Sequence, residues 1–152
     1  MRCPHQRHGK GCGIYGRHPP SCRVWSCAWL VDDDAGDLRR PDRAHYVIDI
    51  MPDFITATFE DAPDQRLPVL QIWIDPQHPD AHRDPALRAY IATRCEQEGG
   101  MAALIRYDSA RAFVLFPPAI SSDGQWHEIH TGVSDREHTA AEINAALTGA
   151  FK

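Results

Sequence analysis

The chain has 152 residues, of which 43% are hydrophobic and 24% are charged. This length allows one domain with its own apolar core and is too short for two large domains. No apolar run approaches the roughly 18 residues that a membrane-spanning helix needs. No short apolar stretch follows the first charges either, so a secretory signal is not expected. We therefore expect a cytoplasmic protein.

Charge is distributed unevenly along the sequence. Residues 1–31 contain five basic side chains and no carboxylate, whereas residues 32–152 contain eleven basic and twenty-one acidic side chains, a net charge of −10. A basic segment is one signature of nucleic-acid binding. Here, however, few aromatic residues accompany the basic ones, and cations also offset the net charge of about −2 on a divalent ion held by four thiolates. Nucleic-acid binding is accordingly not expected.

The first thirty residues contain most of the cysteines, and these point to a metal site. Four of the five cysteines lie there, namely Cys3, Cys12, Cys22 and Cys27. Thiolate sulfur suits zinc and iron–sulfur clusters, and both prefer four ligands. A reducing cytoplasm makes disulfides the less favoured use. Four protein ligands leave no open position for water, so structural zinc is expected, with iron or an iron–sulfur cluster as the alternative.

The same segment lacks the features of an independently folding unit. Closely spaced glycines and the pair Pro19-Pro20 predict irregular structure at residues 1–31. Such a segment needs a staple such as a bound metal. His5 and His8 lie close to Cys3, and because neutral imidazole binds zinc well, either could replace Cys3 as the fourth ligand. Both alternatives stay open.

A polar connector is expected at residues 32–43, and a second unit at residues 44–152. Alternation of apolar and polar residues with a period of two predicts strands. A turn at Met51-Pro52-Asp53 is expected to separate the first two of them. The predicted strands lie at residues 46–50, 54–60, 69–74, 102–107, 112–116 and 125–133.

Two helices complete the predicted unit. Asp84 is a suitable N-cap, Pro85 suits the first helical position, and Gly99-Gly100 end the helix. Its buried stripe is expected to contain Leu87, Tyr90, Ile91 and Cys95. A capping box at Ser134 and Glu137 begins a second helix. The order β-β-β-α-β-β-β-α favours an α+β fold, in which the cysteine-rich module packs on an antiparallel sheet with two helices.

The remaining histidines and carboxylates predict no catalytic site. His78 and His82 lie in a proline-rich loop, and His127 and His130 lack the spacing of a helical zinc motif, so both pairs are expected at the surface. The run Asp32-Asp33-Asp34 is expected to be a solvated turn. No nucleophile with its base can be recognised, which leaves enzymatic activity undetermined.

Residues 11–27, GCGIYGRHPPSCRVWSC, resemble a known motif. This stretch is similar to the YkgJ-like family, small bacterial proteins described as zinc- or iron-chelating cysteine-cluster domains. The resemblance covers residues 3–30. It implies metal-ligand positions at Cys12, Cys22 and Cys27, with Cys3 as the fourth. Many family members carry a further Cys-x-x-Cys-Cys group upstream, and because the first cysteine of this sequence is Cys3, without such a group before it, a single metal ion or cluster is expected. It implies nothing about residues 44–152.

The sequence therefore predicts a metal-binding protein with a four-cysteine site. One alternative is an iron–sulfur protein with a redox or sensing role. Another is an α+β module that binds a ligand or protein partner, with the metal-stapled segment at its rim. The identity of the substrate or partner is not predicted.

Overall fold

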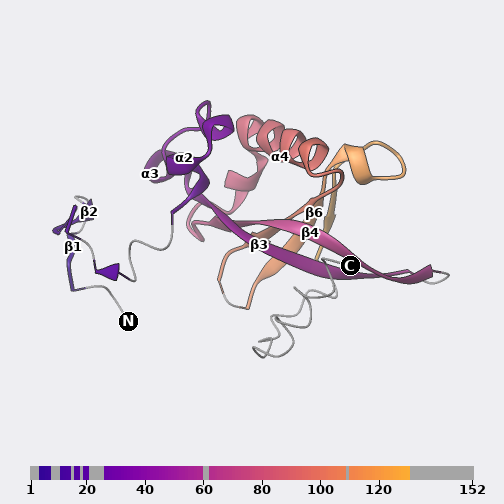
Figure 1. The fold of residues 1–152 in the computed structure, drawn as a ribbon, viewed down its shortest axis with the longest axis horizontal. Helices are drawn as coiled ribbons and strands as arrows, with labels where there is room; N and C mark the ends of the chain where they lie inside the picture. Colours follow the sequence, from indigo (N-terminus) through magenta and orange to yellow (C-terminus); the bar gives the residue numbers. More distant parts are fainter. Residues whose placement is uncertain are drawn as a thin grey trace.

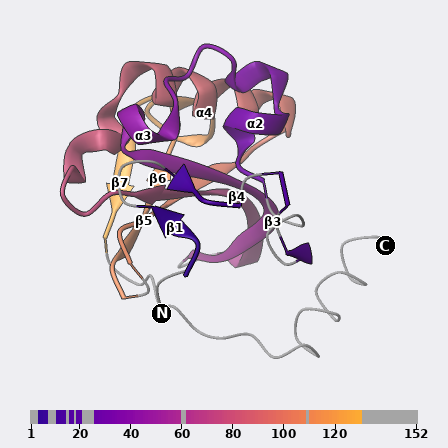
Figure 2. The same cartoon turned by 90° about the vertical axis from the view of Figure 1, so that its left-hand side faces the viewer.

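A mixed sheet with helices on one face forms the body of the protein (Figures 1 and 2). The structure is a computed structural model that describes residues 4–7, 11–14, 16–17, 19–20, 26–59, 62–108 and 110–130. The five strands are β3 (Tyr46–Phe59), β4 (Ala62–Ile74), β5 (Ala102–Arg106), β6 (Ala112–Phe116) and β7 (His127–Ile129), in that spatial order. The helices are α2 (Ala28–Val31), α3 (Pro41–Ala44) and α4 (Pro85–Gln97), with 3₁₀ turns η1 (Asp33–Ala35), η2 (Pro79–Arg83) and η3 (Pro118–Ile120). The α+β class predicted from the sequence is confirmed.

The expectation of a purely antiparallel sheet is wrong at one position. β4 and β5 pair in parallel, from Val69 opposite Ala102 to Trp73 opposite Arg106. The other neighbouring pairs are antiparallel. The parallel pair arises because η2 and α4 carry the chain back across the sheet between the two strands, and a parallel pair requires such a crossover. β5 therefore lies inside the sheet and is buried on both faces, as its apolar sequence allows.

The first two predicted strands are one strand, β3, with an irregularity where a turn was expected. Asp49 pairs with Gln71 and Asp53 with Val69, so three residues of β3 face one residue of β4. Pro52 lies in this bulge, where its missing N–H disrupts no ladder hydrogen bond. Gln71 also donates a side-chain hydrogen bond to Asp53 across the bulge. A proline thus bends the strand without ending it.

The predicted helix after Asp84 is confirmed. The Asp84 carboxylate accepts a hydrogen bond from the N–H of Ala86 at 3.1 Å, and Pro85 occupies the first turn. Gly99 and Gly100 have positive φ angles of 69° and 125°, which glycine adopts without steric cost and which end the helix. The predicted stripe faces the sheet and is buried, comprising Leu87, Tyr90, Ile91 and Cys95.

The apolar core is divided by the sheet into two clusters. The larger cluster lies between the sheet and the helices and includes Ile72, Ile105 and Phe113. The smaller cluster lies on the other face and contains Val69, Ala102, Leu104 and Val114. The predicted C-terminal helix, at residues 134–151, lies outside the described residues. No helix of the described part is long and apolar enough to cross a membrane.

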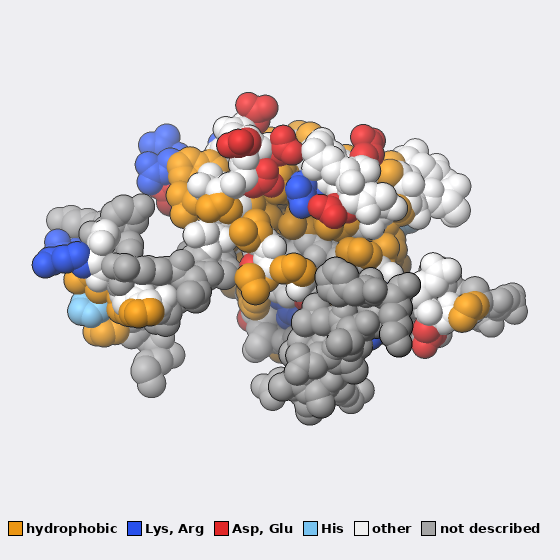
Figure 3. Space-filling model, viewed as in Figure 1, with side chains coloured by type: hydrophobic (Ala, Val, Ile, Leu, Met, Phe, Trp, Pro, Cys, Tyr) orange, Lys and Arg blue, Asp and Glu red, His pale blue; other side chains and the backbone are white. Residues whose placement is uncertain are grey.

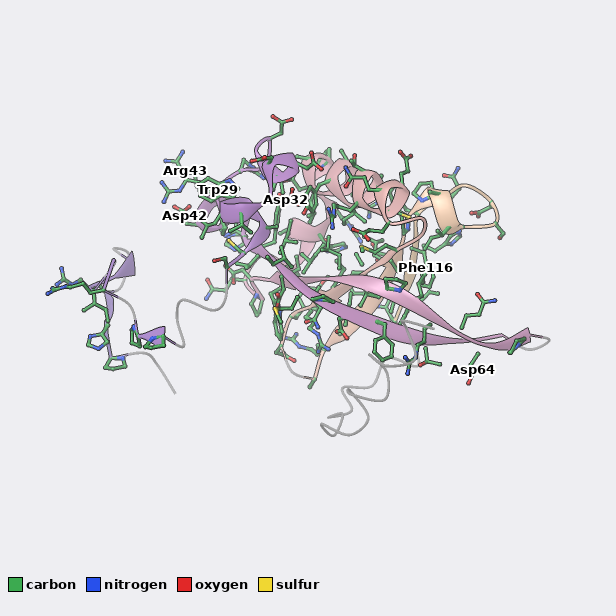
Figure 4. All side chains as sticks on the ribbon, in the orientation of Figure 1. Trp29, Asp32, Asp42, Arg43, Asp64 and Phe116 are labelled. Carbon is green, nitrogen blue, oxygen red and sulfur yellow. The ribbon has the colours of Figure 1, made fainter. Side chains whose placement is uncertain are left out.

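The segment expected as a polar connector packs against the sheet. Ala35 is fully buried and Leu38 is 6% exposed, and both belong to the larger cluster. The Trp29 indole N–H donates to the Leu38 carbonyl oxygen at 3.0 Å, which ties α2 to the chain that follows (Figure 4). Although the segment is rich in charge, its two buried apolar residues are sufficient to order it.

Asp32 links this segment to α4 through a buried tyrosine. The Tyr90 hydroxyl donates to the Asp32 carboxylate at 2.6 Å, and Tyr90 is 5% exposed. Burial raises the pKa of the Tyr90 hydroxyl, and the hydrogen bond to Asp32 and its negative charge raise this pKa further. The aspartate run is therefore more than a solvated turn, since its first member holds a buried hydroxyl.

This pair predicts a loss of stability at alkaline pH. Because the pKa of Tyr90 is higher in the folded than in the unfolded chain, the stabilisation is complete below the ordinary value of 10.0 and is lost as pH rises above it. We expect Tyr90→Phe to lower the free energy of unfolding at pH 7 by about 1.5–3 kcal/mol. Above pH 10 the variant should lose stability less steeply than the wild type. Urea titrations of both proteins at pH 7 to 11 measure the free energy of unfolding. If the wild type and the variant lost stability equally steeply above pH 10, the prediction would be contradicted.

Candidate functional site

Cys27 is the predicted metal ligand whose side chain the structure describes. It precedes α2, and its backbone forms an isolated antiparallel bridge with Asp49 of β3. Cys27 is 6% exposed and forms no disulfide. Among the described residues it is buried but belongs to neither apolar cluster, a position that it shares with the fully buried Pro117. Its thiol is thus shielded from water at the edge of the sheet without being part of the core.

Cys12 lies in a hairpin at the N-terminal side of the molecule (Figure 1). β1 (Gln6–Arg7) pairs antiparallel with β2 (Gly11–Cys12), with Gln6 opposite Cys12. The Gly13 N–H donates to the His5 carbonyl oxygen at 2.8 Å. A Cβ at Gly13 would lie 2.9 Å from the Arg7 side chain and 3.3 Å from the His5 carbonyl oxygen, so a larger residue here would require both to shift. The hairpin gives the backbone of Cys12 a defined place.

The other predicted ligands fall outside the described residues. This applies to Cys3 and Cys22, to the side chain of Cys12, and to His8, one of the two histidine alternatives. His5, the other alternative, lies in an exposed turn before β1. The four-cysteine site remains a prediction.

Cys95 differs from Cys27 in its surroundings, as the sequence predicted. It is 1% exposed, lies within the larger apolar cluster, and accepts a hydrogen bond at its Sγ from the Met101 N–H at 3.3 Å. A thiol buried this deeply is shielded from reagents in solution. Cys95 therefore acts as a core residue.

The prediction that both histidine pairs lie at the surface is wrong for His82. His78, His127 and His130 are exposed, with 47%, 49% and 61% of each side chain accessible. His82 is 3% exposed. It lies in η2 and packs edge-on against Phe113, with ring centroids 5.1 Å apart. No local pattern indicates this burial, because it depends on β6, which lies about thirty residues further along the chain.

The structure brings together a second group that the sequence did not indicate, formed by His45, Asp75 and His78. His78 Nδ1 lies 3.1 Å from Asp75 Oδ2, and His45 Nδ1 lies 3.5 Å from the same oxygen. The backbone N–H of Gln77, and then the His78 ring, hold the pKa of the Asp75 carboxyl below its ordinary value. His45 has a φ of 61°, which allows α3 to end and β3 to begin at this residue.

The geometry of this group does not fit a single metal ion bound by both rings. The two imidazoles stack with centroids 3.5 Å apart and planes 13° from parallel. A metal must lie close to the plane of each ring, about 2.0–2.1 Å from its nitrogen. Nearly parallel planes at this spacing share no such position. In this arrangement the His78 ring is hydrogen-bonded to the Asp75 carboxylate, and the His45 ring lies within ion-pair distance of the same oxygen.

A third group surrounds Glu128 of β7. Its Oε1 lies 3.2 Å from His82 Nε2 and 3.5 Å from Arg88 Nη2, and its Oε2 lies 3.4 Å from His130 Nε2. Burial alone would raise the pKa of Glu128, but hydrogen bonds from His130 and His82 outweigh it, so the pKa lies below the ordinary value of 4.5. The carboxylate is therefore ionised at neutral pH and fixed by surrounding donors.

Comparison of the chain with protein-family models, with curated proteins and with solved structures gives no match. The YkgJ-like resemblance accordingly rests on the motif at residues 11–27 alone. The geometry of the described residues is what bears on function.

Proposed function

We propose that the protein binds one metal ion through Cys3, Cys12, Cys22 and Cys27, and that the metal is structural zinc. The observation that supports this proposal most is the position of Cys27. A buried thiol outside the apolar clusters, next to a chain segment that holds the other cysteines, suits a metal-bound thiolate better than a core side chain. Zinc bound by four thiolates would stabilise the N-terminal segment.

The position of Cys27 also suggests how the metal would act on the fold. Its backbone bridges Asp49 at the edge of the sheet, and α2 begins immediately after it. A metal bound here would fix the N-terminal segment to β3 and α2 at one point. An iron–sulfur cluster at the same cysteines is the alternative. In this proposal the protein is cytoplasmic, since thiolates remain reduced there.

Metal analysis of cysteine variants tests the proposal. We expect wild-type protein purified without oxygen to be colourless and to contain one equivalent of zinc. Cys12→Ala and Cys27→Ala should lose the metal, because an incomplete thiolate set binds far more weakly. Cys95→Ala is the matched control, since it removes a second buried thiol and should keep the full equivalent. Elemental analysis and native mass spectrometry measure metal content.

Two outcomes would contradict the assignment. Full zinc content in Cys12→Ala would exclude this residue as a ligand. Because Cys12 lies in the β1–β2 hairpin and not in the five-stranded sheet, misfolding of the sheet would not explain a loss of metal. Brown protein with visible absorbance would indicate an iron–sulfur cluster in place of zinc.

Replacing His5 and His8 together should leave metal content unchanged, whereas Cys3→Ala should reduce it. The opposite result would place a histidine in the ligand set.

A further inference from the structure

A hollow of about 710 Å³ lies where η2, the first turns of α4 and the chain entering β7 meet. Its lining combines charge with an aromatic ring and consists of Arg83, Pro85, Arg88, Trp126 and Glu128. These residues come from three elements that the parallel crossover brings together. Cavities of this size accommodate small organic ligands.

The lining carries a net positive charge in an acidic part of the chain. Two guanidinium groups face one carboxylate, whereas residues 32–152 as a whole have a net charge of −10. Figure 3 shows acidic side chains gathered along the helical layer in that view. Positive charge concentrated in a hollow of an acidic domain favours an anionic ligand.

Arg88 has hydrogen-bonding capacity available for such a ligand. Its side chain is 26% exposed, and among the described residues its terminal nitrogens form an ion pair with Glu128 alone. Its contact with Glu128 is an ion pair at 3.5 Å, which is long for a charge-assisted hydrogen bond. The guanidinium lies 5.0 Å from the centre of the Trp126 ring, so the indole also positions it. A donor group held in place but not saturated is suited to recognise an oxyanion.

Arg83 provides a second cation at the rim. Its side chain is 61% exposed, and it pairs with Asp80 at 3.5 Å, an aspartate that is 77% exposed. Exposed ion pairs of this kind contribute little stability. Arg83 can therefore exchange Asp80 for a ligand anion at small cost.

His82 contacts Glu128 and helps to fix its position. Its Nδ1 faces the Pro79 carbonyl oxygen at 2.8 Å and its Nε2 faces Glu128 at 3.2 Å. Both ring nitrogens therefore lie within hydrogen-bond distance of an oxygen atom, which holds the ring in place.

We propose that this hollow binds a small organic oxyanion, a carboxylate or a phosphate, which pairs with Arg83 and Arg88 while the flat body of the ligand lies against Trp126. Glu128 is the internal counter-charge of the arginines when the hollow is empty. The proposal depends on the α+β body and is independent of the metal at the N-terminal cysteines.

The probes separate the anion from the ring. Benzoate and phenyl phosphate carry both features, phenol has the ring alone, and inorganic phosphate has the anion alone. The probes are titrated into ¹⁵N-labelled full-length protein, and the indole N–H resonance of Trp126 is assigned with the Trp126→Phe variant. Benzoate or phenyl phosphate should shift this resonance, whereas phenol should not. The tighter of these two ligands identifies the preferred oxyanion. Equal binding of phenol would overturn the proposal.

Arginine variants give the matched comparison. Arg88→Gln should weaken binding about 10- to 100-fold, the effect of losing a charge-assisted hydrogen bond. Arg94→Gln is the control, because Arg94 lies on the same helix, is similarly exposed at 28%, and pairs with Glu98 away from the hollow. If both variants bound the oxyanion equally weakly, the loss would reflect the overall charge of the protein, and the proposed site would be wrong. Arg83→Gln, at an exposed position, provides the same test should Arg88→Gln fail to fold.

Glu128→Gln gives a change of opposite sign. Removing the counter-charge should make oxyanion binding several-fold tighter, since the ligand no longer competes with a carboxylate for the arginines. A purely structural role of Glu128 predicts no such gain. Weaker oxyanion binding in a folded Glu128→Gln variant would contradict the proposal.

Discussion

Phe113→Ala is expected to lower the free energy of unfolding by about 3–5 kcal/mol. Phe113 is 1% exposed and lies in β6 within the larger apolar cluster. Its ring also packs against the imidazoles of His82 and His130, with centroids 5.1 and 4.4 Å away. Truncation would leave a cavity that these neighbours can fill only in part. Urea denaturation followed by circular dichroism measures the loss.

Phe116→Ala is the control for this prediction. Phe116 lies on the same strand but is only partly buried, against the smaller cluster on the other face (Figure 4). Phe116→Ala should therefore lower the free energy of unfolding clearly less than Phe113→Ala does. Equal losses would mean that the two faces of the sheet contribute equally to stability. Phe113→Leu, which keeps most of the volume, should recover part of the loss.

Asp84→Ala is expected to lower the free energy of unfolding by about 2–4 kcal/mol in total, because the Asp84 carboxylate interacts with three partners. It caps α4 at the Ala86 N–H, accepts from the Tyr46 hydroxyl at 3.3 Å, and pairs with Arg39 at 3.1 Å. The lost cap accounts for about 1 kcal/mol. The Tyr46 hydroxyl, on a residue that is 3% exposed, would lose its partner, which costs about 1–3 kcal/mol. Arg39 is 63% exposed and contributes little.

Asp84→Asn separates these contributions. Asparagine is as good an N-cap as aspartate, and its side-chain oxygen can accept from Tyr46. We therefore expect a loss of less than about 1 kcal/mol. Chemical denaturation of both variants provides the comparison. If asparagine were as destabilising as alanine, the negative charge and not the hydrogen bonds would be the main contribution of Asp84.

Local signals in the sequence predicted the elements that local chemistry determines. The N-cap at Asp84, the proline that follows and the two glycines fixed both ends of α4, and its buried stripe followed from helical spacing. The position of Pro52 was interpreted as a turn because proline commonly marks one. Whether a proline ends or only bends a strand depends on the partner strand, which the sequence alone does not reveal.

The candidate site residues also divide into those that local sequence patterns predict and those that depend on contacts between distant parts of the chain. Clustering of cysteines is visible in the sequence, and the burial of Cys95 followed from the spacing of its helix. The burial of His82 and its contact with Glu128 arise from the crossover that places η2 beside β7. No local pattern reports a contact between positions 46 residues apart. For this reason the arginine-lined hollow could be found only in the folded chain.

The bulge at Pro52 also affects how copies of this protein meet one another. β3 is fourteen residues long and is an edge strand, the kind of surface that invites strands of other molecules to add to a sheet. Pro52 offers no N–H to such a strand, and the bridge from Cys27 occupies the edge at Asp49. Towards the tip of the β3–β4 ribbon, where Asp64 lies, charge adds to this protection (Figure 4). The irregularity, at a position where the sequence predicted a turn, thus makes the edge of β3 less suited to pair with a further strand.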